Sequence, residues 1–215
     1  MRRRSLWLVI VLACLLTRGA FASSLIPDER GAGSKEAPIV IEVFGDFQCH
    51  GCAAFYLQTL TRVIENYCNK GMVHLIHHEY PLPIPSHRYA RDAARWALAC
   101  AAIGKYEPAA AALFRNQSTW GGSGDIESTI ASVLTPAELA RVKQIMKDQG
   151  EEIDAALAHD IAIGHSFPVH GIPSFRIVVH GKEMFADHDE PGTDSYNKLD
   201  SYPSLKRFLD EQLGK

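Results

Sequence analysis

The sequence predicts an α/β domain that is interrupted by a long helical insertion. An apolar run over 37–44, a helical pattern over 53–67 and a second strand over 72–80 follow one another. A long crossover between two strands is typical of a parallel βαβ unit. The residues 86–163 are Ala-rich and helical in pattern, and strand character returns at 174–180. One sheet-forming domain is therefore expected to carry the helical segment as an insertion.

The first 22 residues are expected to be a signal peptide. Arg2–Arg4 form a basic region, Leu6–Leu16 an apolar region, and Ala20-Phe21-Ala22 an Ala-x-Ala cleavage site. The apolar region is shorter than the roughly 20 residues that a membrane-spanning helix needs. Cleavage after Ala22 would export a protein of 193 residues, and we expect it in the periplasm.

The charge of the mature chain excludes one class of function. Without the leader, 18 Lys and Arg stand against 25 Asp and Glu, a formal charge of −7. Nucleic-acid binding depends on basic side chains that neutralise phosphates, so no nucleic-acid partner is expected. A chain of this length is expected to form a single core.

The first part of the domain is predicted to span 36–85. Ser23–Lys35 is polar and contains glycine, which indicates a loose N-terminal arm over 23–35. The Val- and Ile-rich run Ala37–Phe44 suits a buried central strand. The helix that follows has apolar residues at helical spacing, namely Phe55, Leu57, Leu60, Val63 and Ile64. The prolines within Pro81–Pro85 then end regular structure.

Four helices are predicted in the insertion over 86–163, at 87–103, 106–115, 136–147 and 151–163. Thr135 and Glu138 form a capping box with Pro136 at the first helical position. Trp120–Gly124 is glycine-rich and is expected to be a loop. The domain resumes over 164–215, with strands at 174–180 and 183–185 and a last helix at 203–213.

Cys49-His50-Gly51-Cys52 lies where the first strand gives way to a helix. Two cysteines at this spacing can close a disulfide across one helical turn and reopen it. The sulfur of Cys49 would lie among unpaired N–H groups at the positive end of the helix dipole. Such surroundings lower a cysteine pKa from about 8.5 to between about 3.5 and 7.5. The motif therefore predicts thiol–disulfide exchange.

Four cysteines remain after the leader is removed, and an even number in an exported protein permits two disulfides. Proximity favours Cys49 with Cys52, which leaves Cys68 with Cys100 as a second, structural bridge. The alternative is that Cys68 and Cys100 are separate buried thiols packed as small hydrophobic groups. The distance between their Cα atoms decides between the two.

Three parts of the chain, one of them made of two ranges, resemble DsbA-like proteins of the thioredoxin superfamily. Phe44–Cys52 is similar to their active-site strand and helix start, Ser86–Ala94 and Gly104–Gln117 to their inserted helices, and Gly171–Phe175 to their cis-proline loop. The resemblance runs from about Gly33 to the C-terminus. It implies a thioredoxin fold with an inserted all-helical subdomain and a cis Ile172–Pro173 peptide.

The resemblance also implies roles for the site residues. Cys49 would be the sulfur that substrates attack, Cys52 would reclose the pair, and Pro173 would lie beside them. An extended substrate segment would be held at Ile172 and Gly51 by strand-like pairing. His50 could donate toward the Cys49 thiolate and so stabilise the reduced form. The alternative is that His50 is an exposed residue without a role.

The chain departs from the family pattern at one position. Many relatives carry a buried acidic residue six positions before the first cysteine, and here that residue is Val43. Glu42 lies one residue earlier and should point to the opposite face of the strand. Asp46 is a second candidate proton acceptor, although a turn-forming role before the helix explains it equally well.

The sequence thus favours a dithiol oxidase whose only redox group is the Cys49–Cys52 disulfide, with no bound cofactor and no metal. His74 and His78 share a strand face while His77 takes the other, and no second ligand cluster accompanies them. The resemblance implies exported proteins with free thiols as substrates and a membrane reoxidase of the DsbB or VKOR type. A monomer is expected, because only a short arm precedes the core.

Three alternatives remain open at this point. One is a reductase or isomerase of the same superfamily, which the reduction potential would distinguish. Another is a metal-binding module or thiol chaperone that uses Cys49 and Cys52 as ligands. The last is a relative in which the bridge is only structural and Cys49 is unreactive.

Overall fold

The computed structural model describes residues 25–27, 30–167, 169–186, 199 and 201–215. The predicted signal peptide over 1–22 lies outside the described residues. Within them, no helix is both long and apolar enough to cross a membrane.

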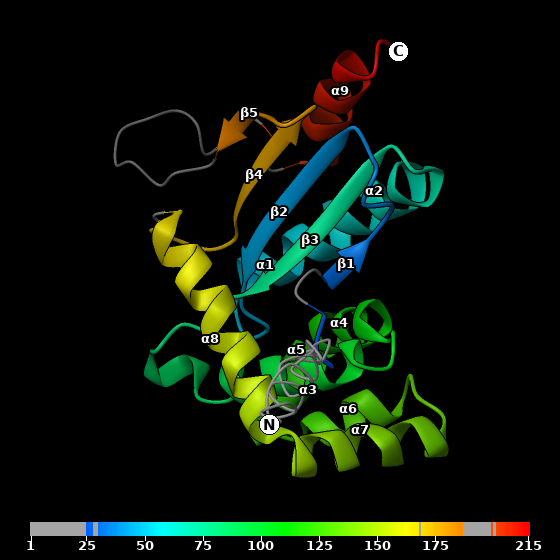
Figure 1. The fold of residues 1–215 in the computed structure, drawn as a ribbon. Helices are drawn as coiled ribbons and strands as arrows, with labels where there is room; N and C mark the ends of the chain where they lie inside the picture. Colours follow the sequence, from blue (N-terminus) through cyan, green and yellow to red (C-terminus); the bar gives the residue numbers. More distant parts are fainter. Residues whose placement is uncertain (1–24, 28–29, 168, 187–198, 200) are drawn as a thin grey trace, which may run out of the picture.

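A mixed sheet in the strand order β1-β3-β2-β4-β5 forms the centre of the fold (Figure 1). β2 (Ile39–Gly45) runs parallel to β3 (Val73–Glu79), which confirms the predicted βαβ unit. β4 (Ser174–Val179) lies antiparallel on the other side of β2, and β5 (Lys182–Ala186) follows it as a hairpin. β1 (Arg30–Ala32) pairs antiparallel with β3. β2 is therefore a central strand, as its apolar sequence predicts.

The described part of the N-terminal arm, residues 25–27 and 30–35, is not loose over Arg30–Ala32, which corrects the prediction there. It contributes β1, whose Arg30 is 3% exposed and forms an ion pair with Asp160. Gly31 has a φ of +152°, and a Cβ atom there would lie 2.0 Å from the carbonyl oxygen of Leu75. A strand of three residues has no period that the sequence could display, so this edge strand could not be predicted.

Gly31→Ala is expected to destabilise the protein by about 3 kcal/mol, the upper end for a single substitution. The added Cβ would force β1 away from the backbone of β3 and would remain strained at this φ. Gly71→Ala is the control, because Gly71 also has a positive φ but faces open space. It should cost only the backbone strain of about 1–2 kcal/mol. Equal losses of unfolding free energy in urea would contradict the close contact at Gly31.

The predicted crossover helix is confirmed between β2 and β3. It consists of α1 (His50–Phe55), a π-helical turn over Tyr56–Leu60 and α2 (Thr61–Asn66). A 3₁₀ turn over Cys68–Lys70 leads into β3. The last helix, α9 (Tyr202–Gln212), packs against α2 on the same side of the sheet. The helix begins at His50, three residues before its apolar pattern does.

The insertion is helical throughout its described elements and gathers at the end of the sheet where β2 and β3 finish (Figure 1). After a 3₁₀ turn over Pro85–His87, its helices are α3 (Ala90–Ala101), α4 (Tyr106–Arg115), α5 (Gln117–Ser123), α6 (Ile126–Ala131), α7 (Pro136–Asp148) and α8 (Gly150–Ser166). The four predicted helices are confirmed. The capping box is also confirmed, because the carboxylate of Glu138 accepts from the backbone N–H of Thr135 at 2.8 Å.

The loop expected over Trp120–Gly124 is wrong, since α5 covers most of it. Trp120 is fully buried, and its indole N–H donates to the carbonyl of Leu113 at 2.8 Å. Burial of this large side chain offsets the low helix propensity of the neighbouring glycines.

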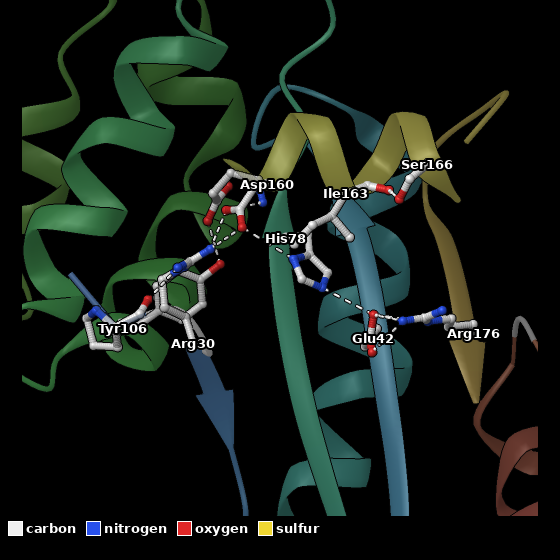
Figure 2. Close-up of polar contacts among 10 residues, drawn as sticks. Arg30, Glu42, His78, Tyr106, Asp160, Ile163, Ser166 and Arg176 are labelled. Carbon is white, nitrogen blue, oxygen red and sulfur yellow. Dashed lines mark hydrogen bonds and ion pairs between the residues drawn. The ribbon is translucent and has the colours of Figure 1, made fainter. Parts of the chain in front are cut away.

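A chain of charged side chains fastens α8 to the sheet (Figure 2). Asp160 of α8 binds Arg30 of β1, and its Oδ1 lies 3.3 Å from Nδ1 of His78 on β3. His78 Nε2 lies 3.4 Å from Glu42 of β2, which accepts two hydrogen bonds from Arg176 of β4 at 2.9 and 3.0 Å. Burial favours a neutral His78, but Asp160 and Glu42 outweigh it and raise its pKa. One helix of the insertion is thus linked to four strands.

Candidate active site

The local sequence explains why Cys49 begins a helix. Asp46 Oδ1 accepts from the backbone N–H of Gln48 at 2.6 Å, and the Asp46 carbonyl accepts from the N–H of Cys49 at 3.0 Å. This Asx turn ends β2 and turns the chain into α1. Cys49 itself is the N-cap residue of α1.

The sulfur of Cys49 is half-buried and hydrogen-bonded. It accepts from the backbone N–H of Cys52 at 3.4 Å and lies 3.6 Å from the carbonyl oxygen of Ile172. The thiol of Cys52 lowers the pKa of Cys49 most, and the N–H groups of Cys52 and Gly51 add to this. Together they outweigh burial and the negative charge of Asp46, and they bring the pKa to about 6. This value lies within the range expected for a cysteine at a helix start.

Cys52 lies deeper in the protein, with 3% of its surface exposed. Burial raises the pKa of this thiol well above its ordinary value, and the neighbouring Cys49 adds to the effect. Cys49 and Cys52 are both free thiols here, so the structure describes the reduced pair. One acidic, accessible sulfur beside a buried, neutral one is the asymmetry that directed exchange requires.

Three further predicted residues meet at Cys49. The Ile172–Pro173 peptide is cis, as the resemblance implied. A Cβ atom on Gly51 would lie 3.4 Å from Cδ of Pro173 and 3.7 Å from Sγ of Cys49. Glycine at this position therefore lets the proline loop approach the sulfur closely. His50 is exposed at the first position of α1, and its predicted influence on the thiolate stays a prediction.

A groove opens beside Gly51 and Pro173. Its volume is about 510 Å³, and α1, the π-helical turn and the start of α9 form its walls. The apolar part of its lining includes Phe55, Phe175 and Tyr202. The groove thus lies between the start of α1 and the proline loop.

Two glutamines that sequence reasoning missed join the active-site turn to the insertion. Gln48 accepts from the N–H of Tyr89 at 2.6 Å and donates to the carbonyl of Gly121 at 3.0 Å. Gln117 Nε2 donates to the carbonyls of Phe47 and Cys49 at 2.7 and 3.0 Å. No sequence pattern marks such contacts, because each glutamine bonds to backbone groups of residues that are distant in the sequence.

Glu42 and Asp46, the two acidic residues that precede the motif, are each held by other hydrogen-bonding partners. Glu42 points to the face covered by α8, where hydrogen bonds from His78 and Arg176 outweigh burial and lower its pKa to about 2. Asp46 is 1% exposed and accepts three hydrogen bonds, from the N–H groups of Gln48 and Leu82 and from Nδ1 of His87 at 2.7 Å. Asp46 is thus built into the turn.

Cys68 and Cys100 are both free and buried in this structure. Burial raises the pKa of each thiol to about 12. Cys68 follows α2 in the sheet domain, whereas Cys100 lies within α3 of the insertion. The structural bridge between Cys68 and Cys100 stays a prediction, with two separate buried thiols as its alternative. Among the described residues, no group of three His, Cys, Asp or Glu side chains is arranged to hold a metal ion.

Comparison with known proteins fits this geometry. A family model described as thioredoxin matches residues 26–193. The chain belongs to this family. The thioredoxin assignment covers the sheet, the active-site helix and the whole helical insertion.

Two curated relatives are similar over nearly their whole length. The chain is 25% identical to the probable disulfide bond formation protein D of Bacillus cereus, covering 98% of this chain and 97% of the relative. It is 26% identical to the protein of the same name from Bacillus anthracis, covering 98% and 96%.

Solved structures share the fold. BdbD from Bacillus subtilis superposes with a TM-score of 0.65 at 16% identity, over 87% of this chain and 94% of that one. Wolbachia pipientis alpha-DsbA1 gives a TM-score of 0.65 at 16% identity, over 89% and 96%. The protein is therefore a DsbA-like member of the thioredoxin superfamily with a helical insertion. With its cysteine pair in place, it is a thiol:disulfide oxidoreductase.

Proposed function

We propose that this protein is a periplasmic dithiol oxidase that introduces disulfide bonds into exported proteins. The observation that supports this direction is the acidity of Cys49, whose pKa is lowered to about 6. Stabilising the thiolate stabilises the reduced enzyme, and a stabilised reduced form makes the disulfide a stronger oxidant. The names of the curated relatives, which refer to disulfide bond formation, point the same way.

The reaction begins with the Cys49–Cys52 disulfide. A substrate thiolate attacks Sγ of Cys49, the bond to Cys52 breaks, and the Cys52 sulfur leaves with the electron pair. A second substrate thiol then attacks the mixed disulfide and releases Cys49 as a thiolate. The substrate gains a disulfide and the enzyme is left with two thiols. Cys49 is a good leaving group in this second step because its pKa is low.

The substrates in this proposal are exported proteins with free thiols, and the groove beside Gly51 and Pro173 is where they bind. An extended segment there would meet the backbone of Ile172 next to the sulfur of Cys49. A membrane reoxidase of the DsbB or VKOR type would restore the disulfide after each cycle. The enzyme acts as a monomer after removal of residues 1–22.

The test is equilibration of the purified enzyme with glutathione redox buffers. A reduction potential between about −180 and −120 mV is expected, the range of oxidising members of the superfamily. A value near or below about −270 mV, that of thioredoxin, would instead indicate a reductase. The Cys49→Ser variant supplies the baseline without exchange.

The stability of the reduced enzyme is expected to depend on pH in one direction. The Cys49 pKa is about 6 in the folded protein and about 8.5 in an unfolded chain. Its thiolate therefore contributes stability that is fully present above about pH 8.5 and is lost as the pH falls through about 6. The oxidised enzyme has no such group. Urea unfolding of both forms between about pH 5 and pH 9 should show the free energy of unfolding of the reduced form rising with pH relative to that of the oxidised form. A difference between the two forms that does not change with pH would contradict the thiolate.

A further inference from the structure

A small cavity lies beneath the buried cysteine. Its volume is about 20 Å³, and Cys52, Gly45, Glu79 and Tyr106 are among the residues that line it. A cavity of this size holds one water molecule when polar groups face it. The hydroxyl of Tyr106 and the carboxyl of Glu79 are such groups, and the hydroxyl donates to Glu79 Oε1 at 2.5 Å.

The strand register places Glu79 on the same face as Cys52. Glu79 ends β3 and is the register partner of Gly45 on the parallel strand β2. Partners on neighbouring strands point to the same face of a sheet, about 4.8 Å apart. A Cβ atom on Gly45 would lie 3.7 Å from Sγ of Cys52. Because Gly45 has no side chain, nothing from β2 separates the sulfur from the carboxyl at this position.

Val43 explains why the carboxyl comes from β3. It lines the same cavity from β2, two residues before Gly45 and on the same face. The position six residues before the first cysteine is therefore apolar and cannot exchange a proton. Glu79 is the acidic residue that reaches this cavity in the described part of the chain.

The surroundings keep Glu79 protonated near neutral pH. Burial raises its pKa to about 8, and the carboxylates of Asp160 and Asp46 act in the same direction. The hydrogen bond from Tyr106 and the charge of Arg30 oppose the shift without cancelling it. His77 also lines the cavity, and its Nε2 lies 3.0 Å from Glu107, which accepts from the hydroxyl of Tyr56 at 2.7 Å.

We propose that Glu79 exchanges a proton with Cys52 through a water molecule in this cavity. When a substrate thiolate attacks Cys49, the electron pair of the broken bond leaves with Cys52. The water gives a proton to that sulfur and takes one from the carboxyl of Glu79, which becomes a carboxylate. In the reverse step, the carboxylate accepts the proton of Cys52 as its sulfur attacks the mixed disulfide on Cys49. This role rests on the proposed exchange function.

The test isolates the step in which Cys52 attacks. Reduced enzyme is mixed with glutathione disulfide, and the decay of the Cys49–glutathione mixed disulfide is followed across pH. Glu79→Gln keeps the shape and a hydrogen-bonding group for Tyr106 but cannot exchange the proton. It should slow the decay on the order of 10²-fold and remove an inflection near pH 8. Alkylation of Cys49 by iodoacetamide should keep its wild-type rate.

Glu107→Gln is the matched control. Glu107 is a half-buried carboxyl of the same region that lies outside the lining of the cavity, so its variant should keep the wild-type pH profile. A second variant, Gly45→Ala, places a methyl group at ordinary contact distance from Cys52 Sγ and should slow the same step if Glu79→Gln does not fold.

The outcomes separate the two proposals. In the first outcome, the wild-type enzyme exchanges with glutathione, but the mixed disulfide of Glu79→Gln decays at the wild-type rate with the same inflection. Gly45→Ala takes the place of Glu79→Gln if the latter does not fold. This outcome would show that the proton role of Glu79 is wrong, while the oxidase proposal stands. If wild-type Cys49 forms no mixed disulfide at all, the proposed function itself fails.

Discussion

Cys49→Ser is expected to abolish thiol–disulfide exchange, reducing the rate to that of the uncatalysed reaction. In the proposed reaction the sulfur of Cys49, which α1 holds next to Ile172, is attacked in the first step and is the leaving group in the second. Serine fits the same N-cap position, so the fold should survive. The measurement is the rate at which the oxidised enzyme forms a disulfide in a reduced, unfolded substrate protein.

Cys52→Ser should behave differently from Cys49→Ser. It keeps the exposed sulfur but removes the one that recloses the pair, so it should accumulate a mixed disulfide through Cys49. Cys100→Ala is the control, because this thiol is buried and its pKa is raised to about 12. Full activity in Cys49→Ser, or loss of activity in Cys100→Ala without unfolding, would contradict the assignment of the site.

Asp160→Ala is expected to have the largest effect on stability, a loss of about 3–5 kcal/mol. Asp160 is fully buried and binds Arg30, His78 and the backbone N–H of Glu79. Its removal leaves the buried guanidinium of Arg30 without its carboxylate and releases α8 from the strands that it joins (Figure 2).

Asp154→Ala on the same helix is the matched control. Asp154 also binds two arginines, Arg91 and Arg95, but 40% of its side chain is exposed. Exposed pairs contribute about 0–1 kcal/mol, so this variant should unfold close to wild type. The comparison uses the free energy of unfolding in urea. Equal losses of unfolding free energy in the two variants would show that the buried Arg30–Asp160 pair stabilises the protein no more than an exposed pair does.

The sequence predicted those elements whose hydrophobic period or capping residues are local. Ala37–Phe44 has the apolar run that is typical of a central strand. The four residues Thr135–Glu138 contain the capping box that predicts a helix start. Cys49 and Cys52 are likewise predictable, because a helix N-terminus and its effect on a thiol depend on neighbouring residues alone.

The remaining features depend on contacts between distant segments. β1 is held in place by the ion pair of Arg30 with Asp160, which is 130 residues away in the sequence. Trp120 makes a helix out of a glycine-rich segment because it enters the core. Glu79 and Cys52 line one cavity because of the register of two strands and the missing side chain at Gly45. None of these pairings leaves a period or a motif in one sequence.

Titration of the reduced enzyme, following the ultraviolet absorbance of the thiolate with Cys49→Ser as the blank, tests the central claim most directly. An acidic sulfur at the start of α1 predicts a single transition with a midpoint near pH 6. A midpoint at or above about 8.5, the value of an ordinary cysteine, would contradict the account of the site and the oxidase proposal built on it.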